Sequence, residues 1–169
     1  MSATSIEFTP KFLFTLETAE GNLRRIHPHK SALKPAPDKW SVREILGHLI
    51  DSAIVNSQRI LNAQTQEYLI FSRYPQNQYV EVQKYQEQDW EQLIQIWKNV
   101  NLHIKEIVER IPNDTLDKSH HNHNFHEITS RFTSPDEPVT LRFLIEDYHF
   151  HMVHHLNRIF SMHGPETLS

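Results

Sequence analysis

Three histidines have the residue type and the spacing needed to bind a metal ion. His151 and His155 are four residues apart in EDYHFHMVHHLNRIF, and residues at this spacing share one face of an α-helix. His48, in WSVREILGHLIDS, could supply a third imidazole from a facing helix. Three imidazoles leave coordination positions open, which is the arrangement of metal sites that do chemistry. The spacing therefore predicts a three-histidine site for one cation.

The histidines also admit structural explanations. A single histidine beside an apolar helix face often packs as a hydrogen-bonded core residue, and HxxxH recurs by chance in a chain with 13 histidines. The chain has no HExxH and no GxSxG, so neither a metalloprotease nor a serine hydrolase is supported. A second group of histidines, in SHHNHNFHE, could bind metal, form a loop near the pocket mouth or lie on a solvated surface. It consists of His120, His121, His123 and His126.

Polar residues near the three histidines predict a pocket around the ion. Asp147 lies one turn before His151, where its carboxylate could accept a hydrogen bond from the second ring nitrogen. A solvated carboxylate in the first helical turn is the alternative. Three polar residues share a helical face with His48 and predict one wall of the pocket: Ser52, Asn56 and Arg59. Arg59 could orient an anionic group of the substrate or form a surface salt bridge.

The composition limits the classes of protein to which the chain can belong. It has 169 residues, 38% of them hydrophobic and 22% charged, which suits one compact domain. The net charge of −4 offers no basic surface to a phosphate backbone, so we expect no nucleic-acid partner. The absence of cysteine excludes disulfides, thiolate ligands and a cysteine nucleophile. No secretory leader or membrane span is recognisable, and we expect a cytoplasmic protein.

The elements that position these residues are predicted to be helices. The chain contains only three glycines, fewer than the tight turns of a sheet-rich fold need. Apolar residues recur at helical spacing in four segments, and helices are predicted over about 10–27, 41–67, 89–111 and 139–163. The sequence thus predicts a single all-α domain over 1–169, with a long irregular connection at 113–138.

Local signals set the ends of these four helices. Pro10 is placed to open the first helix, and Ser41 with Glu44 forms a capping-box signature at the start of the second. Asp89 can cap the third helix, and Gly164 followed by proline ends the last.

The second predicted helix carries an additional apolar face. Ile50, Ile54 and Leu61 are offset from the stripe that faces the core. Such a face can pack against a second copy of the chain, so we expect a homodimer.

Two blocks of the sequence resemble a known family. WSVREILGHLIDSAIVNSQRI at 40–60 and LRFLIEDYHFHMVHHLNRI at 141–159 are similar to the DinB/YfiT-like superfamily of metal-dependent enzymes. In that family a tryptophan-led second helix carries one metal histidine, and the last helix carries two more spaced by four. His48, His151 and His155 match these positions. The blocks and the order of helices cover most of the chain, whereas 113–138 matches no part of the pattern.

The resemblance implies a fold, a cofactor and a range of reactions. The fold is a four-helix bundle with long crossover connections, often dimeric, with zinc or nickel bound at one end. The group includes thiol S-transferases that act with bacillithiol or mycothiol, isomerases, and members without an assigned reaction. Its name refers to DNA damage and does not imply DNA binding.

These observations predict a metal-dependent enzyme with a small-molecule substrate. A divalent metal on three neutral imidazoles would lower the pKa of a bound water or low-molecular-weight thiol, for hydrolysis or S-transfer. The sequence does not distinguish these reactions, or identify the substrate, the native metal or a catalytic residue. Two alternatives are a non-catalytic metal- or ligand-binding bundle in stress response, and an interaction module whose histidines only pack.

Overall fold

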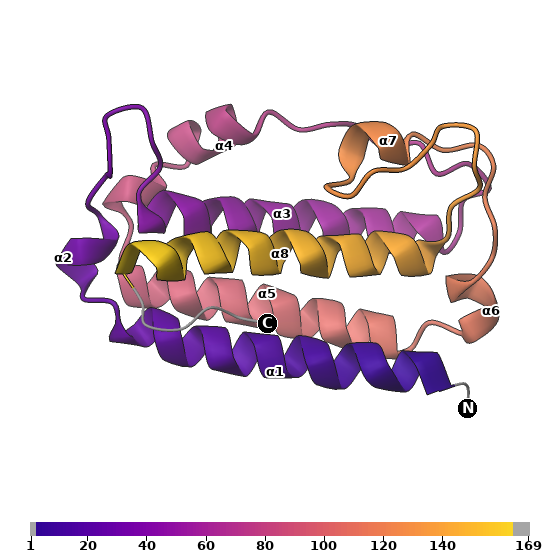
Figure 1. The fold of residues 1–169 in the computed structure, drawn as a ribbon, viewed down its shortest axis with the longest axis horizontal. Coiled ribbons are helices and arrows are strands. Elements are labelled where there is room, and N and C mark those ends of the chain that lie inside the picture. Colours follow the sequence, from indigo (N-terminus) through magenta and orange to yellow (C-terminus); the bar gives the residue numbers. More distant parts are fainter. Residues whose placement is uncertain (1–2, 164–169) are drawn as a thin grey trace.

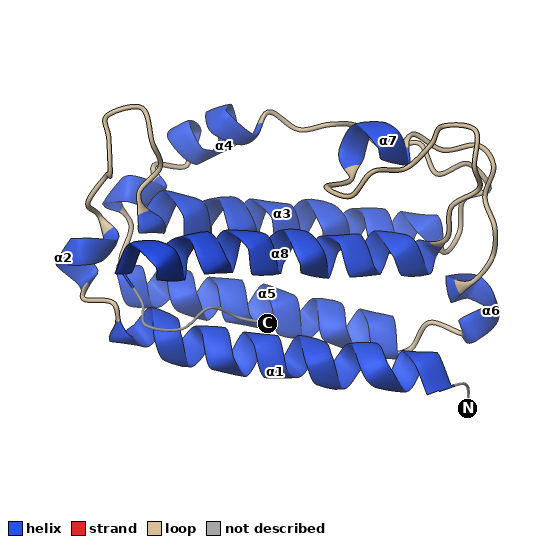
Figure 2. Ribbon diagram, in the orientation of Figure 1, coloured by secondary structure: helices blue, strands red, loops and turns tan. Residues whose placement is uncertain are grey.

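Four long helices form the body of the molecule (Figure 1). We describe a computed structural model, which places residues 3–163. The long helices are α1 (Ala3–Arg25), α3 (Val42–Ala63), α5 (Trp90–Glu109) and α8 (Leu141–His163). Shorter helices lie between them: α2 (Pro28–Ser31), α4 (Gln76–Val82), the 3-10 helix η1 (Tyr85–Glu87), α6 (Asn113–Leu116) and α7 (Phe125–Ile128). Within the described range no strand is formed (Figure 2).

The chain path is that of a bundle with a crossover. Figure 1 shows α3 and α5 running in one direction and α1 and α8 in the other. The connection from α3 to α5 therefore returns along the length of the molecule, carrying α4 and η1 over one side of the bundle. The connection from α5 to α8 stays at one end and carries α6 and α7. None of the helices placed by the structure is long and apolar enough to cross a membrane.

Side-chain caps begin three of the long helices, two of them at the positions that the sequence indicates. Ser41 and Glu44 form the predicted capping box, with the Glu44 carboxylate accepting from the Ser41 N–H at 2.8 Å. The Asp89 carboxylate accepts a backbone N–H of the first turn of α5 at 2.9 Å. Thr140 caps α8 in the same way at 3.2 Å. The expected stop signal at Gly164 and Pro165 lies outside the described residues.

The prediction that α1 begins at Pro10 is wrong. The helix begins at Ala3, so Pro10 lies inside it and cannot donate the usual backbone hydrogen bond. Phe8 precedes the proline, and its ring stacks on Phe12 at 5.2 Å and meets His149 edge-on at 5.8 Å. These aromatic contacts stabilise the helical turn before the proline.

The helix α3 ends at Ala63, four residues before its predicted end. The chain leaves the helix because Leu69 pairs with a distant segment. The Leu69 N–H donates to the Asn122 carbonyl at 2.9 Å, and the Leu69 carbonyl accepts from the Asn124 N–H at 3.2 Å. This pairing joins the two connections at one end of the bundle.

The core lies between the four long helices. Its largest fully buried side chains include Trp90, Trp97 and Tyr148. The Tyr148 hydroxyl donates to the Asn101 side-chain oxygen, which satisfies a polar group in the centre of the bundle. This hydrogen bond joins α8 to α5, and α3 packs against both of these helices. The candidate site residues lie on α3 and α8.

Candidate metal site

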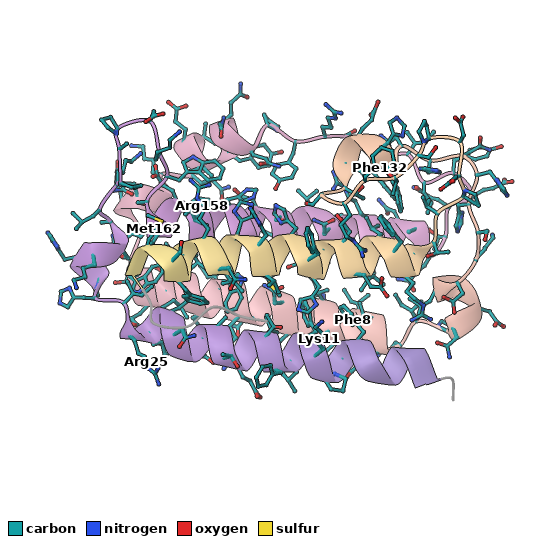
Figure 3. The ribbon with its side chains drawn as sticks, viewed as in Figure 1. Phe8, Lys11, Arg25, Phe132, Arg158 and Met162 are labelled. Atoms are coloured by element: carbon teal, nitrogen blue, oxygen red, sulfur yellow. The ribbon has the colours of Figure 1, made fainter. Side chains whose placement is uncertain are left out.

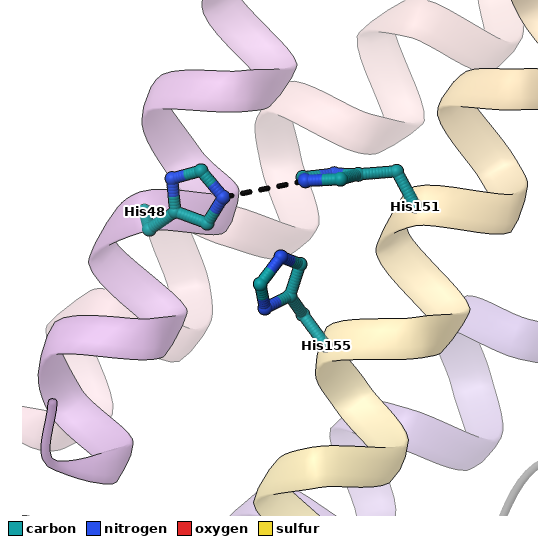
Figure 4. Close-up of side chains that lie close together, drawn as sticks. All are labelled: His48, His151 and His155. Atoms are coloured by element: carbon teal, nitrogen blue, oxygen red, sulfur yellow. Dashed lines mark hydrogen bonds between the residues drawn. The ribbon is translucent and has the colours of Figure 1, made fainter. Parts of the chain in front are cut away.

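The neighbouring helices α3 and α8 bring the three predicted histidines together. The Nε2 atoms of His48 and His151 are 3.3 Å apart. His155 lies one turn along α8, and one ligand atom from each of the three residues lies within 4.8 Å of the others. Figure 4 shows a ring nitrogen of His155 pointing toward the other two rings. Among the described residues, this is the one cluster of potential ligands with this geometry.

The donor set and its spacing fit a divalent cation with nitrogen ligands. Zn–N bonds of about 2.0–2.1 Å in tetrahedral geometry place two ligand nitrogens about 3.3 Å apart. The separation between His48 and His151 has this value. The Nδ1 atoms of His48 and His155 are buried and have no hydrogen-bond partner in the described part of the chain. A metal on the opposite nitrogen would explain why imidazoles rather than apolar side chains occupy these positions.

Burial keeps all three imidazoles neutral. It lowers the pKa of His48 to about 3, with a further contribution from His151. Burial likewise lowers the pKa of His151 to about 4, against a partly compensating attraction from Asp147. The pKa of His155 falls to about 3, through burial and then the neighbouring imidazoles. Near neutral pH each ring therefore has a lone pair that can coordinate a cation.

Aromatic rings enclose the buried side of the cluster. The ring of Trp40 lies 5.1 Å from that of His48, and Tyr74 stacks near the same imidazole at 6.5 Å. Tyr74 is a site residue that sequence reasoning missed, because it lies in a connection with no periodic pattern. Burial, with a smaller effect of Asp51, raises its pKa to about 12, so the phenol remains a hydrogen-bond donor.

The other histidines of α8 have different surroundings. His154 is exposed. His149 is buried on another side of α8, where its Nε2 lies 2.9 Å from the Thr15 hydroxyl. Burial lowers the pKa of His149 to about 4, and Lys11 contributes further.

Asp147 does not contact a histidine ring in the way that its spacing suggests. It is buried, which also excludes the solvated alternative. Its Oδ1 accepts from the Arg131 N–H at 2.8 Å, and its Oδ2 accepts from the Ser130 N–H at 3.0 Å. The second ring nitrogen of His151 instead faces the Ser52 hydroxyl at 3.4 Å. Asp147 thus holds the 130–131 segment beside the site.

The polar residues of α3 line a cavity next to His151. Ser52 is adjacent to that ring, and the Asn56 amide donates to the Ser52 carbonyl at 2.9 Å. Arg59 is buried, which contradicts the surface salt bridge considered for it, and donates to the Ser72 carbonyl at 2.9 Å. These residues border a cavity of about 190 Å³, here called the Arg59 cavity.

A second cavity borders the cluster from the side of α8. It has a volume of about 400 Å³ and is lined by Ser130, Phe150, His151, His154 and His155. Two of the three clustered imidazoles therefore face space that a small molecule can occupy.

The histidine-rich segment at 119–127 is structural in part. His120 and His123 are buried, and each ring contacts a backbone carbonyl, that of Glu67 at 3.0 Å and that of Glu137 at 2.8 Å. His121 and His126 are exposed. The two buried rings thereby tie together the loops at one end of the bundle.

Comparisons with known proteins agree with this fold. One similar solved structure is YfiT from Bacillus subtilis, described as "a probable metal-dependent hydrolase with an unusual four-helix bundle topology". It is 16% identical, has a TM-score of 0.71, and the match covers 96% of this chain and 87% of YfiT. The match confirms the predicted all-α four-helix bundle. Among curated proteins no relative matches. The profile of the DinB superfamily matches residues 15–159, and so the chain belongs to the DinB superfamily.

Proposed function

We propose that this protein is a metal-dependent enzyme whose metal ligands are His48, His151 and His155. The observation that carries the proposal is the approach of three neutral imidazoles from two helices to within 4.8 Å. Zinc and nickel are the ions we favour, because imidazole nitrogen suits both. A bound divalent cation lowers the pKa of a coordinated water or thiol toward neutrality.

The surrounding residues support hydrolysis of a small molecule or S-transfer from a low-molecular-weight thiol. The cavity beside α8 gives such a molecule access to His151 and His155. Ser52 and Asn56 can orient polar groups of the substrate by hydrogen bonding. The description of YfiT as a probable hydrolase, although it concerns that protein, makes hydrolysis the first reaction to test.

Metal analysis by mass spectrometry tests the ligand set. Protein purified without a histidine tag is compared with the variants His48→Ala and His48→Ala/His151→Ala/His155→Ala. We expect the bound zinc or nickel to fall about tenfold or more in both, because each removes a direct ligand. His154→Ala is the matched control, since this histidine is exposed next to the cluster. Unchanged metal content in His48→Ala would overturn the three-histidine site.

Turnover assays then distinguish an enzyme from a binding protein. The zinc-loaded and nickel-loaded proteins are tested on ester, amide and thiol–electrophile substrates, with the triple alanine variant as the blank. Activity that depends on the three histidines supports the proposal. Retained metal without turnover on any class would favour a non-catalytic metal- or ligand-binding bundle in stress response. Absence of metal would favour histidines that only pack.

A further inference from the structure

We propose that the Arg59 cavity binds a carboxylate group of the substrate, with Arg59 as its cationic partner. The inference rests on the proposed function, because the carboxylate would belong to the molecule that reacts at the three histidines. It names a substrate class, small organic monocarboxylates, and a binding residue distinct from the candidate metal ligands.

The guanidinium of Arg59 is buried with most of its hydrogen-bonding capacity unused. It has five N–H donors, and it makes one hydrogen bond, from Nη2 to the Ser72 carbonyl. Its Nε atom is buried without a partner among the placed residues. Arg59 takes part in none of the ion pairs formed between described residues. Because a buried charge normally has a charged or strongly hydrogen-bonding partner, the site requires an anion from outside.

The buried carboxylate that attracts Arg59, that of Asp147, already has other partners. Asp147 accepts two backbone N–H groups, and its Oδ1 also lies 3.5 Å from the Arg131 guanidinium. The Asp147 charge is therefore balanced mainly by the 130–131 segment. Burial lowers the Arg59 pKa, and attraction to Tyr74 and then to Asp147 opposes this effect. Arg59 stays charged and keeps its free donors.

The cavity connects this charge to the candidate metal site. Its volume of about 190 Å³ suits a small group, and its lining includes Ser52, Tyr74 and His151 as well as Arg59. Arginine binds carboxylates through two parallel N–H···O bonds, for which its free Nε is suited. The Tyr74 phenol can donate a further bond. A carboxylate held there would direct the rest of the molecule past Ser52 to the histidines.

The charge of the lining favours a monoanion over a phosphate dianion. Arg59 is the one arginine or lysine in the lining, whereas Asp147 and Glu127 both border the cavity. A doubly charged phosphate would be repelled by these two carboxylates with a single cation to compensate. A carboxylate has a single negative charge, which the one cation of the lining can balance.

Nuclear magnetic resonance of the arginine Nε–H groups tests the proposal at pH 7. The full-length protein, both metal-free and zinc-loaded, is titrated with acetate, and separately with neutral acetamide and with inorganic phosphate. The Arg59 resonance is assigned by its loss in Arg59→Lys, which keeps the positive charge. We expect acetate to shift this resonance saturably in both forms, acetamide to leave it unchanged, and phosphate to bind more weakly.

Binding measurements on variants complete the test. We expect acetate affinity to fall about tenfold or more in Arg59→Gln, because charged hydrogen bonds are lost. Arg25→Gln is the control, since Figure 3 shows Arg25 projecting outward from α1. An unmoved Arg59 resonance, equal affinity in Arg59→Gln, or tighter binding of phosphate would overturn the proposal. Because acetate binding is also measured without metal, failure of the carboxylate proposal can be distinguished from failure of the metal site.

Discussion

At the scale of single residues, the imidazole rings of the cluster are neutral in the metal-free protein. Burial is the main cause of the lowered pKa of His48, His151 and His155, and repulsion from a neighbouring imidazole adds to it in each case. A cation arriving near pH 7 therefore displaces no protons from the folded protein. The same burial makes the metal-free fold sensitive to acid.

We predict that the metal-free protein loses stability as the pH falls from about 6.5 to about 4. An unfolded histidine titrates near 6.5. The folded values are about 3 for His48 and His155 and about 4 for His149 and His151. The unfolded chain thus binds more protons in this window, and the free energy of unfolding decreases with decreasing pH. The raised pKa of Asp51 has the opposite effect on the free energy of unfolding, but it is one group against four histidines.

Urea unfolding of the metal-free protein between pH 7 and pH 4.5 measures this slope. We expect a loss of at least about 1 kcal/mol per pH unit, since one fully shifted histidine alone accounts for about 1.4. The triple alanine variant, which lacks three of the four groups, should show a smaller slope. Stability that is constant from pH 6.5 to 4.5 would contradict the proposed neutral state of the rings.

At the scale of secondary-structure elements, the contact of η1 with α3 fixes the helix next to His48. A Cβ atom on Gly47 would lie 2.2 Å from the ring of Tyr85, so only glycine allows this approach. One turn later, Asp51 accepts a hydrogen bond from the Tyr85 hydroxyl at 2.7 Å and one from the Gln83 amide at 2.6 Å. These contacts hold the connection between α3 and α5 against the part of α3 that carries His48.

We predict that Gly47→Ala destabilises the protein by about 1–3 kcal/mol, because the added methyl displaces a buried tyrosine ring. Metal affinity should fall with it, since His48 is the next residue. Thermal melting of the metal-free protein and zinc titration measure the two effects. The matched control is Gly21→Ala in α1, where no atom lies within 4 Å of the added Cβ. That change should stabilise by about 0.5–1 kcal/mol through helix propensity. Equal stability of Gly47→Ala and wild type would refute the tight contact.

At the scale of the whole molecule, α3 leaves an apolar strip uncovered. Ile54 is 51% exposed and Leu61 is 42% exposed, whereas Ile50 of the same predicted face is buried. The homodimer expected from the sequence stays a prediction. We propose that it forms across this strip, because burying these side chains removes apolar surface from water.

Light scattering coupled to size exclusion measures the mass in solution. We expect twice the chain mass of 20.1 kDa for the wild type and a single chain mass for Ile54→Glu/Leu61→Glu. Ile96→Glu, on the exposed face of α5, is the control and should leave the mass unchanged. A wild type with the mass of one chain would end this prediction.

The four long helices and the faces of the candidate ligands were predictable because they depend on residues within about four positions of one another. The capping box at Ser41 is of this kind. The role of Asp147 was not predictable from the sequence, because the 130–131 backbone that it binds follows a path set by distant contacts. Tyr74 was missed because it lies in a connection without a periodic pattern. Pro10 was misplaced because the packing of Phe8 outweighs a local rule.

The long separation of the candidate ligands along the chain has a thermodynamic consequence. His48 and His151 are 103 positions apart, so an ion bound to both acts as a reversible cross-link that closes a loop of that length. An ion that binds the folded chain and not the denatured one stabilises the fold by mass action, by about 2.7 kcal/mol when the free ion is at about 100 times its dissociation constant. The ion that activates a nucleophile would also join the first third of the polypeptide to its last helix.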